Sequence, residues 1–356
     1  MSLEILKEKV GYHVIKQLLE GKPPEFELKV RSAKNAIYDE QQRILLLGDM
    51  TQKRRFNNLG ELRAFSQMIL IARAIYEAKK EIGYTTQRDI YYNALETIKG
   101  TNIDTLKDQK ESNAIITDLE VYTGLLREEM GVIAEERGVV AGKLKLRGYS
   151  RGEEQIVDCE KGLTGQLIPA NIHEVEIFDL DAELVLVVEK GGIFKSLREL
   201  MIDRKLNCIL VSGHGQPDRA SRRLVHRLNK EFGLPVYILT DCDPWGFRIF
   251  SVYKIGSRNL AFESIKLATP DAKFIGVYPS DIEKLKFDRG IIQATPRDIR
   301  TAQMLMKLPW FSDKRWQEEL SLFIREKKKV EINILSQKGF RYLADEYIPN
   351  RIKEFQ

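Results

Sequence analysis

Cysteine and histidine are scarce in this chain of 356 residues, which contains three cysteines and four histidines. Cys159, Cys208 and Cys242 are odd in number and widely spaced, so the sequence indicates neither a disulfide framework nor a Cys₄ zinc site. The histidines show no metal-ligand spacing, and we expect packing or surface roles for them. This usage fits a reducing cytoplasm and not a disulfide-rich secreted protein.

Long apolar runs and a nucleotide-binding loop are also missing. Residues 1–10 carry charges without an apolar core, and no later run approaches the length of a membrane span, so no membrane association is predicted. The stretch Gly191-Gly-Ile-Phe-Lys-Ser196 lacks the Gly-Lys-Ser/Thr order of a P-loop. Any dependence on ATP would therefore come from another chain.

Basic residues are clustered although the formal net charge is only +5. Such clusters are ordinarily solvated surface, and they become phosphate contacts only where the chain carries a nucleic-acid chemistry. The length allows two domains plus an extension. The clusters are Lys53-Arg54-Arg55, Lys143/Lys145/Arg147, Arg219/Arg222/Arg223/Arg227 and Lys327-Lys328-Lys329.

Strand-like and helix-like segments alternate from Ala182 onward, which predicts a parallel sheet with right-handed crossovers. In the helix expected over 217–232, one apolar stripe should face the sheet, and the arginines should lie mostly elsewhere. The expected strands are 184–189, 208–212, 236–240 and 274–278, and the stripe consists of Leu224, Val225, Leu228 and Phe232.

Carboxylates follow two of these strands at the point where each strand ends. Asp241 and Asp243 come directly after one apolar run, and Glu189 ends another. Because the carboxyl ends of parallel strands meet at one edge of a sheet, three acids should converge there, where they could hold a hard cation such as Mg²⁺. The alternative is an Asp-rich turn that caps the next helix.

This arrangement resembles the Toprim domain of topoisomerases, bacterial-type primases and some nucleases. That domain has a Glu at the end of one strand, as at Glu189, and the pattern D-x-D-x-x-G at the end of another, as at Asp241 to Gly246. The glycines after each acid would let a phosphate approach the backbone at the start of the following helix. The resemblance implies a Toprim metal-binding domain, which we place at 181–356.

The first part of the chain predicts three helices and a β-hairpin, the elements of a CAP-like winged-helix domain, over 61–142. The helices are expected over 62–80, from Thr86 with a capping box to Asp89, and over 112–130, and the hairpin over 132–141. Many winged helices mediate protein contacts only, and composition does not decide between that role and DNA binding. Residues 1–60 form an N-terminal arm that either docks a partner or packs on its own domain. Residues 143–180 form a linker and the entry to the second domain, with strand-like fragments such as residues 155–158. The fold class is thus multidomain α/β.

Two adjacent tyrosines provide a candidate nucleophile for the acid site. On a helix, Tyr91 shares its face with Leu95 and Ile98 and is expected in the core. Tyr92 falls on the polar face, where Arg88 one turn earlier could stabilise a phenolate or hold the attacked phosphate. Without the second domain, Tyr92 would be an ordinary surface tyrosine.

Together these motifs resemble the A subunit of DNA topoisomerase VI and its relatives, the meiotic double-strand-break proteins, from about residue 60 to the C-terminus. The motifs that carry the resemblance are Arg88-Asp-Ile-Tyr-Tyr92, Val188-Glu-Lys-Gly191, Gly213-His-Gly-Gln-Pro-Asp218 with Arg222, and Asp241-Cys-Asp-Pro-Trp-Gly246. In that family the second tyrosine is the nucleophile, which implies Tyr92, and the Toprim acids imply Glu189, Asp241 and Asp243 as Mg²⁺ ligands.

The resemblance implies an ATP-dependent type IIB topoisomerase in which two such chains form a homodimer on double-stranded DNA. Each Tyr92 would become joined to a 5′-phosphate, and the Tyr92 of one chain would face the acids of its mate. A GHKL-type ATPase B subunit would complete an A₂B₂ heterotetramer, in the cytoplasm at the nucleoid. Two alternatives remain: a stand-alone homologue that breaks DNA without the ATPase partner, and a DNA-binding protein with an inactive Toprim domain.

Overall fold

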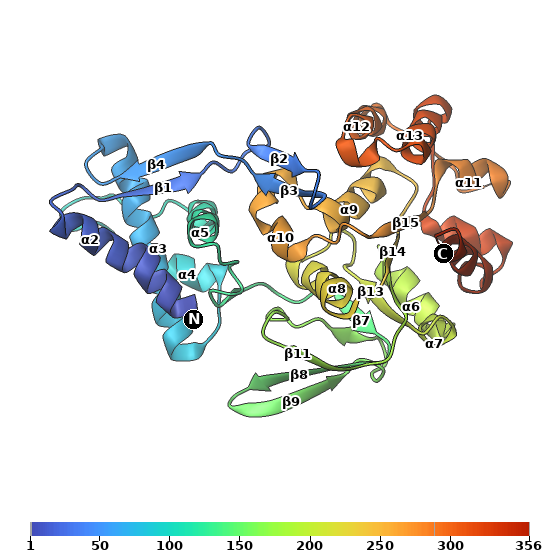
Figure 1. The fold of residues 1–356 in the computed structure, drawn as a ribbon, viewed down its shortest axis with the longest axis horizontal. Coiled ribbons are helices and arrows are strands. Elements are labelled where there is room, and N and C mark those ends of the chain that lie inside the picture. Colours follow the sequence, from blue (N-terminus) through green and yellow to red (C-terminus); the bar gives the residue numbers. More distant parts are fainter. Residues whose placement is uncertain (1, 288, 356) are drawn as a thin grey trace. The chain divides into compact units, whose positions relative to one another are not determined.

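The computed structural model describes residues 2–287 and 289–355, which form two compact units (Figure 1). Among these residues, no helix is long and apolar enough to cross a membrane. The first unit comprises the chain up to Ile37, Leu46–Glu135 and Arg258–Glu263, and the second comprises Tyr38–Leu45, Glu136–Ser257 and the chain from Ser264 onward.

The first unit is built around the long helix α3 (Leu59–Ile82), as the apolar stripe predicts. The Asn58 side chain caps its start by accepting from the backbone N–H of Gly60, and Gly83 ends it at a φ of 82°. The buried face of α3 carries Phe65, Met68, Ile71 and Ile75 among others. The other elements are α1 (Ser2–Leu6), η1 (Lys7–Tyr12), α2 (His13–Leu19), β1 (Glu25–Lys29), β4 (Thr51–Arg55), β5 (Thr85–Thr86), α4 (Gln87–Ala94), α5 (Gln109–Thr123), β6 (Val132–Ile133) and η2 (Arg258–Glu263).

The N-terminal segment packs on its own domain, one of the two roles the sequence leaves open. α1 and η1 lie against α3, and Leu6 and Val10 belong to the same apolar core as Phe26 and Leu28 of β1. β1 and β4 pair antiparallel, with Glu25 opposite Arg55. Residues 1–60 therefore contribute core side chains to the first unit, in addition to any surface they offer a partner.

A short stretch of this segment belongs to the second unit. β2 (Ala36–Asp39) and β3 (Ile44–Leu47) form a hairpin whose tip, Tyr38–Leu45, groups with that unit. There the ring of Tyr38 lies 5.5 Å from that of Trp310, and Arg43 pairs with Asp271 at 2.5 Å.

The prediction of a hairpin over 132–141 is wrong, although the three helices of the winged-helix prediction are present. β6 pairs in parallel with β5, with Val132 opposite Thr85, whereas β7 (Val139–Ala141) lies beside β13 (Cys208–Ser212) in the second unit. β6 and β7 each form backbone hydrogen bonds with a strand far away in sequence, and local turn signals do not reveal such pairing. α5 also ends earlier than expected, at Gly124 in the left-handed conformation.

The second unit contains a six-stranded sheet in the order β10-β7-β13-β12-β14-β15. The central strands β12, β13, β14 and β15 are parallel, as the alternating sequence pattern predicts. At one side of the sheet, β7 runs antiparallel to β13, and β10 runs antiparallel to β7. The remaining elements of the sheet region are β10 (Gln166–Leu167), β12 (Leu184–Val188), α6 (Gly191–Glu199), α7 (Ile202–Lys205), α8 (Arg219–Phe232), β14 (Val236–Leu239), α9 (Pro244–Ile255), α10 (Ser264–Leu267) and β15 (Lys273–Gly276).

Strand β12 positions the candidate site because the order in which strands are added to the sheet reverses at this strand. β13, next in the chain among these parallel strands, lies on one side of β12, and β14 lies on the other. All five β12 residues are buried, as an apolar run covered on both faces requires. In open α/β sheets, ligands bind at the carboxyl ends of the strands where the strand order reverses. Glu189 and Asp241 follow the two strands at this position.

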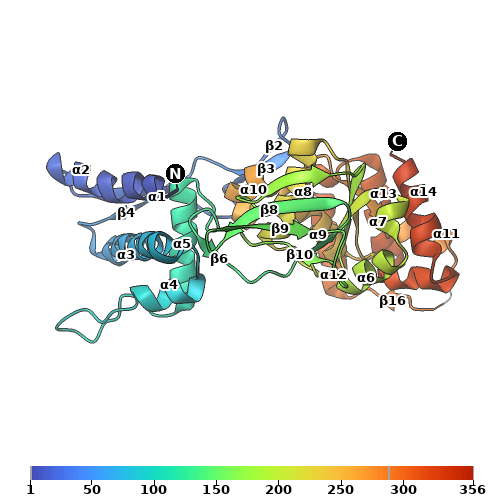
Figure 2. The same ribbon diagram turned by 90° about the horizontal axis from the view of Figure 1, so that it is seen from below.

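The segment 143–180, predicted as a linker and entry to the second domain with a strand-like fragment at 155–158, contributes three strands to a sheet of their own. β8 (Leu144–Ser150) pairs antiparallel with β9 (Glu153–Asp158) and β11 (Glu176–Leu180), and Figure 2 shows β8 and β9 side by side. Leu144 and Leu146 are buried while Lys145 between them is less so, the period-two pattern of a half-buried strand. The sequence indicated the strand at 155–158, but the glycine-rich and charged composition of the segment hid the alternation in β8.

Helix α8 follows the predicted stripe with two exceptions. Leu224, Val225 and Leu228 are buried, but Phe232 in the last turn is 40 % exposed. Arg222, predicted mostly away from the sheet, is buried as well. The chain closes with α11 (Pro279–Lys284), β16 (Ile292–Gln293), α12 (Pro296–Met306), η3 (Pro309–Phe311), α13 (Lys314–Glu326), β17 (Lys328–Lys329), η4 (Ile332–Lys338), η5 (Leu343–Tyr347) and α14 (Ile348–Lys353).

Candidate active site

Helix α4 of the first unit carries the candidate nucleophile and starts with the predicted capping box. The Thr86 hydroxyl accepts from the Asp89 N–H, and the Asp89 carboxylate accepts from the Thr86 N–H, both at 3.2 Å. The Thr86 hydroxyl also donates to the Asp89 carboxylate at 2.7 Å, and this bond, together with the bond from the Thr86 N–H, lowers the pKa of Asp89. The helix ends at Ala94, earlier than a helical face from Tyr91 to Ile98 requires, so Ile98 lies outside it.

The two tyrosines of α4 have the contrasting environments that helical phase predicts. Tyr91 packs against the apolar core of the first unit, whereas Tyr92 is 58 % exposed. The guanidinium carbon of Arg88 lies 5.9 Å from the centroid of the Tyr92 ring. Arg88 is therefore close enough to interact with a phenolate oxygen or with a phosphate that approaches it.

Glu189 of the second unit directly follows β12, and its side chain is largely desolvated. Its Oε2 accepts from the backbone N–H of Asp241 at 3.0 Å. Burial raises the pKa of Glu189 to about 7, and the nearby negative charges of Asp241 and Asp243 add to the rise. A bound cation would offset both the burial and the repulsion.

Asp241 follows β14 and already has a cationic partner. One oxygen accepts from the Ile332 N–H at 2.9 Å, and the other lies 2.8 Å from the Lys190 ammonium. Lys190 also pairs with Glu331 at 2.9 Å, so its charge bridges two carboxylates. The ion pairs raise the pKa of Lys190 against the opposing effect of its burial, which keeps the side chain charged.

Asp243 caps helix α9, the alternative role that the sequence leaves open for an Asp-rich turn. Its Oδ1 accepts from the N–H groups of Trp245 and Gly246 at 2.9 and 2.8 Å. A side chain at Gly246 would collide with the Asp241 carbonyl, 2.3 Å from the position of a Cβ, so the turn requires glycine. Burial raises the pKa of Asp243.

The three acids are neighbours through adjacent strands, but they are not gathered as a ligand set. Among residues 2–287 and 289–355, no three His, Cys, Asp or Glu side chains form a group that could hold a metal ion. Lys190 takes one oxygen of Asp241, and the helix cap takes one of Asp243. The donor chemistry suits a hard divalent cation, and binding one would require these side chains to exchange partners.

Comparisons with known proteins match both units. A sequence model for the Toprim domain shared by the A subunit of topoisomerase 6 and Spo11 matches residues 184–352, and one described as "Type IIB DNA topoisomerase" matches residues 63–132. The A subunit of type 2 DNA topoisomerase 6 from Hyperthermus butylicus is 43 % identical over 99 % of this chain and 94 % of its own length. The protein of the same name from Saccharolobus shibatae is 41 % identical over the same shares.

The chain belongs to the family of topoisomerase VI A subunits. A plant relative, the A subunit of DNA topoisomerase 6 from Arabidopsis thaliana, is 33 % identical over 99 % of this chain and 81 % of its own length. The second unit contains the Toprim domain of this type IIB DNA topoisomerase family, which confirms the predicted fold class.

In this topoisomerase VI family member, three residues beside the acids have no role predicted from the sequence. Lys190 and Glu331 form the ion-pair bridge, and Glu331 lies 90 positions beyond Asp241 in the chain, so no local signal connects them. His214 lies against Gly191, where a Cβ would be 2.2 Å from its ring, and its Nδ1 is 2.6 Å from the Arg137 carbonyl oxygen. The Gly213-His-Gly-Gln-Pro-Asp218 motif was the available signal for His214.

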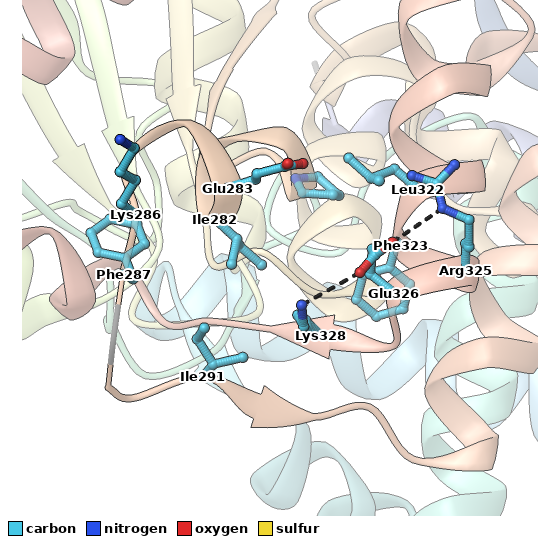
Figure 3. Close-up of a pocket in the computed structure, with 11 residues that line it drawn as sticks. Ile282, Glu283, Lys286, Phe287, Ile291, Leu322, Phe323, Arg325, Glu326 and Lys328 are labelled. Atoms are coloured by element: carbon cyan, nitrogen blue, oxygen red, sulfur yellow. Dashed lines mark hydrogen bonds and ion pairs between the residues drawn. The ribbon is translucent and has the colours of Figure 1, made fainter.

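The Toprim unit also contains a cavity of about 420 Å³ between α11 and α13 (Figure 3). Ile282, Phe287 and Phe323 supply apolar lining, and Glu326 pairs with Arg325 and Lys328 at 3.1 and 3.4 Å. None of the three acids lines it. Because Glu326 neutralises two of the basic side chains, the cavity is a poor match for a phosphate.

Proposed function

We propose that the chain is the DNA-cleaving subunit of an ATP-dependent type IIB topoisomerase and that Tyr92 is its nucleophile. The observation that carries the assignment is the pair of environments on α4: Tyr92 is exposed beside Arg88, while Tyr91 packs into the core. The Tyr92 hydroxyl loses its proton as its oxygen attacks the phosphorus, and the bond between the phosphorus and the 3′-oxygen breaks. The 3′-oxygen takes up a proton and leaves as a 3′-hydroxyl, and the 5′-phosphate stays joined to Tyr92. Religation is the reverse reaction and conserves the phosphodiester energy.

Glu189, Asp241 and Asp243 would hold Mg²⁺ in this proposal. The support is that burial and mutual repulsion disfavour the charged carboxylates, a penalty that a cation offsets. When bound, the ion supplies electrostatic stabilisation to the attacked phosphate. Lys190 compensates the charge of Asp241, and an ion held by this carboxylate would have to displace Lys190 from it.

Two copies of the chain would act on one duplex, with the Tyr92 of each facing the acids of the other. An ATPase B subunit of the GHKL type would complete an A₂B₂ complex. The surface of helix α2 supports a partner contact, because Ile15, Leu18 and Leu19 are exposed on it.

The assignment is tested by mapping the covalent product. The chain is incubated with supercoiled plasmid and Mg²⁺, with and without ATP and the ATPase partner, and the DNA-linked peptide is identified by mass spectrometry. We expect a 5′-phosphate on Tyr92 and formation only with the partner. A product on Tyr91 or on another residue would refute the nucleophile, and full cleavage without partner or ATP would favour the stand-alone enzyme.

A further inference from the structure

An exposed tryptophan in the second unit, which contains the Toprim domain, has two arginines close to its ring. Trp245 is the second residue of α9 and is 38 % exposed. The guanidinium carbons of Arg248, one turn further on α9, and of Arg297 on α12 each lie 5.0 Å from its ring centroid. Both distances are within cation–π range, so one ring orders two positive charges.

Both guanidiniums carry uncompensated charge. Across the described part of the chain, neither Arg248 nor Arg297 forms an ion pair with a carboxylate. Neighbouring Lys329, by contrast, is paired with Asp298 at 2.9 Å. Two exposed like charges on one ring repel each other, and an anion in contact with both would relieve that repulsion.

The position of the ring relates this positive charge to the acid site. The backbone N–H of Trp245 donates to the Asp243 carboxylate at 2.9 Å, so the backbone that carries the ring is held two residues from one of the acids. A DNA strand whose scissile phosphate lies at the acids would bring its neighbouring phosphates past Trp245. Phosphate contacts of this kind fix the register of a duplex without reading its sequence.

We propose that Trp245, Arg248 and Arg297 form a phosphate clamp for the DNA strand beside the cleavage site. The inference rests on the proposed function, because it assumes that the acids act on DNA. Arg248 and Arg297 contact backbone phosphates, and Trp245 is a positioning residue that holds their guanidinium planes. The bound species is double-stranded DNA, recognised through its charge.

The salt dependence of DNA binding tests the clamp. Each lost phosphate contact reduces the slope of log affinity against log salt by about 0.9. Affinities of full-length variants for a fluorescent duplex are measured by anisotropy in Mg²⁺, all in a Tyr92→Phe background so that covalent capture does not interfere. Arg248→Ala and Arg297→Ala should each lower the slope by about 0.9, and Trp245→Ala should lower it by more than either. Trp245→Phe should restore it, because a benzene ring also accepts a guanidinium.

The matched control is Arg147→Ala. Arg147 lies 4.8 Å from the Phe178 ring but is neutralised by Glu176 at 2.9 Å, so its loss should leave the slope unchanged. Unchanged slopes for both Arg248→Ala and Arg297→Ala would overturn the proposal. This holds also if the two substitutions instead weaken capture of the ATPase partner. Equal slopes for Trp245→Phe and Trp245→Ala, with both arginine variants lowered, would overturn the role of the ring. Failure of the Tyr92→Phe parent to bind duplex would refute the proposed function itself.

Discussion

The candidate nucleophile and the candidate metal ligands differ in how strongly the fold depends on them. Tyr92 projects from α4, a helix of eight residues, and its ring contacts Tyr91 and Arg88. Glu189 and Asp241, by contrast, follow fully buried strands and accept hydrogen bonds from the backbone. Chemistry and stability are therefore separable in the first unit and coupled in the second.

The largest expected effect separates chemistry from stability at Tyr92. Tyr92→Phe removes one exposed hydroxyl, so covalent DNA attachment should fall at least about 10³-fold while the melting temperature stays unchanged. Tyr91→Phe is the matched control and should remain active. Gel assays for protein-linked DNA and calorimetry measure the two quantities. An active Tyr92→Phe enzyme with an inactive Tyr91→Phe enzyme would reverse the assignment.

In the second unit, one substitution should affect both properties. Asp241→Ala should abolish cleavage and also destabilise the unit by about 2 kcal/mol, because the Ile332 N–H loses its acceptor and the Lys190 ammonium keeps only Glu331 of its two carboxylate partners. Denaturant unfolding and plasmid cleavage with Mg²⁺ test this. Wild-type cleavage in EDTA would show that no metal is needed, and an unchanged stability would contradict the coupling.

Glu189 should make the Toprim unit less stable as the pH rises. Because its pKa is raised from 4.5 to about 7, the folded chain retains a proton that the unfolded chain loses, and stability falls between those values. Glu189→Gln lacks this titration and should be more stable than wild type by on the order of 2 kcal/mol above pH 7, in EDTA. At pH 4 the two proteins should be equal. Melting curves across this range would contradict the account if the difference were independent of pH.

The smallest effect concerns the helix cap that positions the nucleophile. Thr86→Ala removes the capping box of α4 and should cost about 1 kcal/mol, with cleavage reduced less than tenfold as the first turn frays. Asp108→Ala, which removes the cap of α5 in the same unit, is the control and should cost similar stability with less effect on cleavage. Equal losses of cleavage would mean that α4 is not specifically positioned by its cap.

The features that could be predicted from the sequence are those that depend on local patterns. Alternating apolar runs and the acids at their ends are local patterns, so the parallel sheet, the position of Glu189 and Asp241 at adjacent strand ends, and the capping box at Thr86 were all predictable. Helical phase likewise separated Tyr91 from Tyr92, although α4 ends before Leu95 and Ile98, the residues expected to share the Tyr91 face.

The missed features depend on partners far away in the chain. Val132 pairs with Thr85 and Val139 with Ser212, so the predicted hairpin does not form. Lys190 is bridged to Glu331 across 141 positions, and no periodicity reports such a contact. Asp243 was predicted as a metal ligand with a cap as the alternative, and the structure places its Oδ1 in the cap. Whether it also binds metal depends on its remaining oxygen and stays a prediction.

The central claim is that Tyr92 and the Toprim acids form one reaction centre, shared between two copies of the chain. It is tested most directly by mixing Tyr92→Phe protein with Glu189→Gln protein, each inactive alone, under conditions of chain exchange with ATP and the ATPase partner. A heterodimer then has one site with both changes and one site with wild-type Tyr92 and wild-type Glu189. The account predicts nicked plasmid that carries covalently bound protein. No nicks from verified heterodimers would contradict the shared centre.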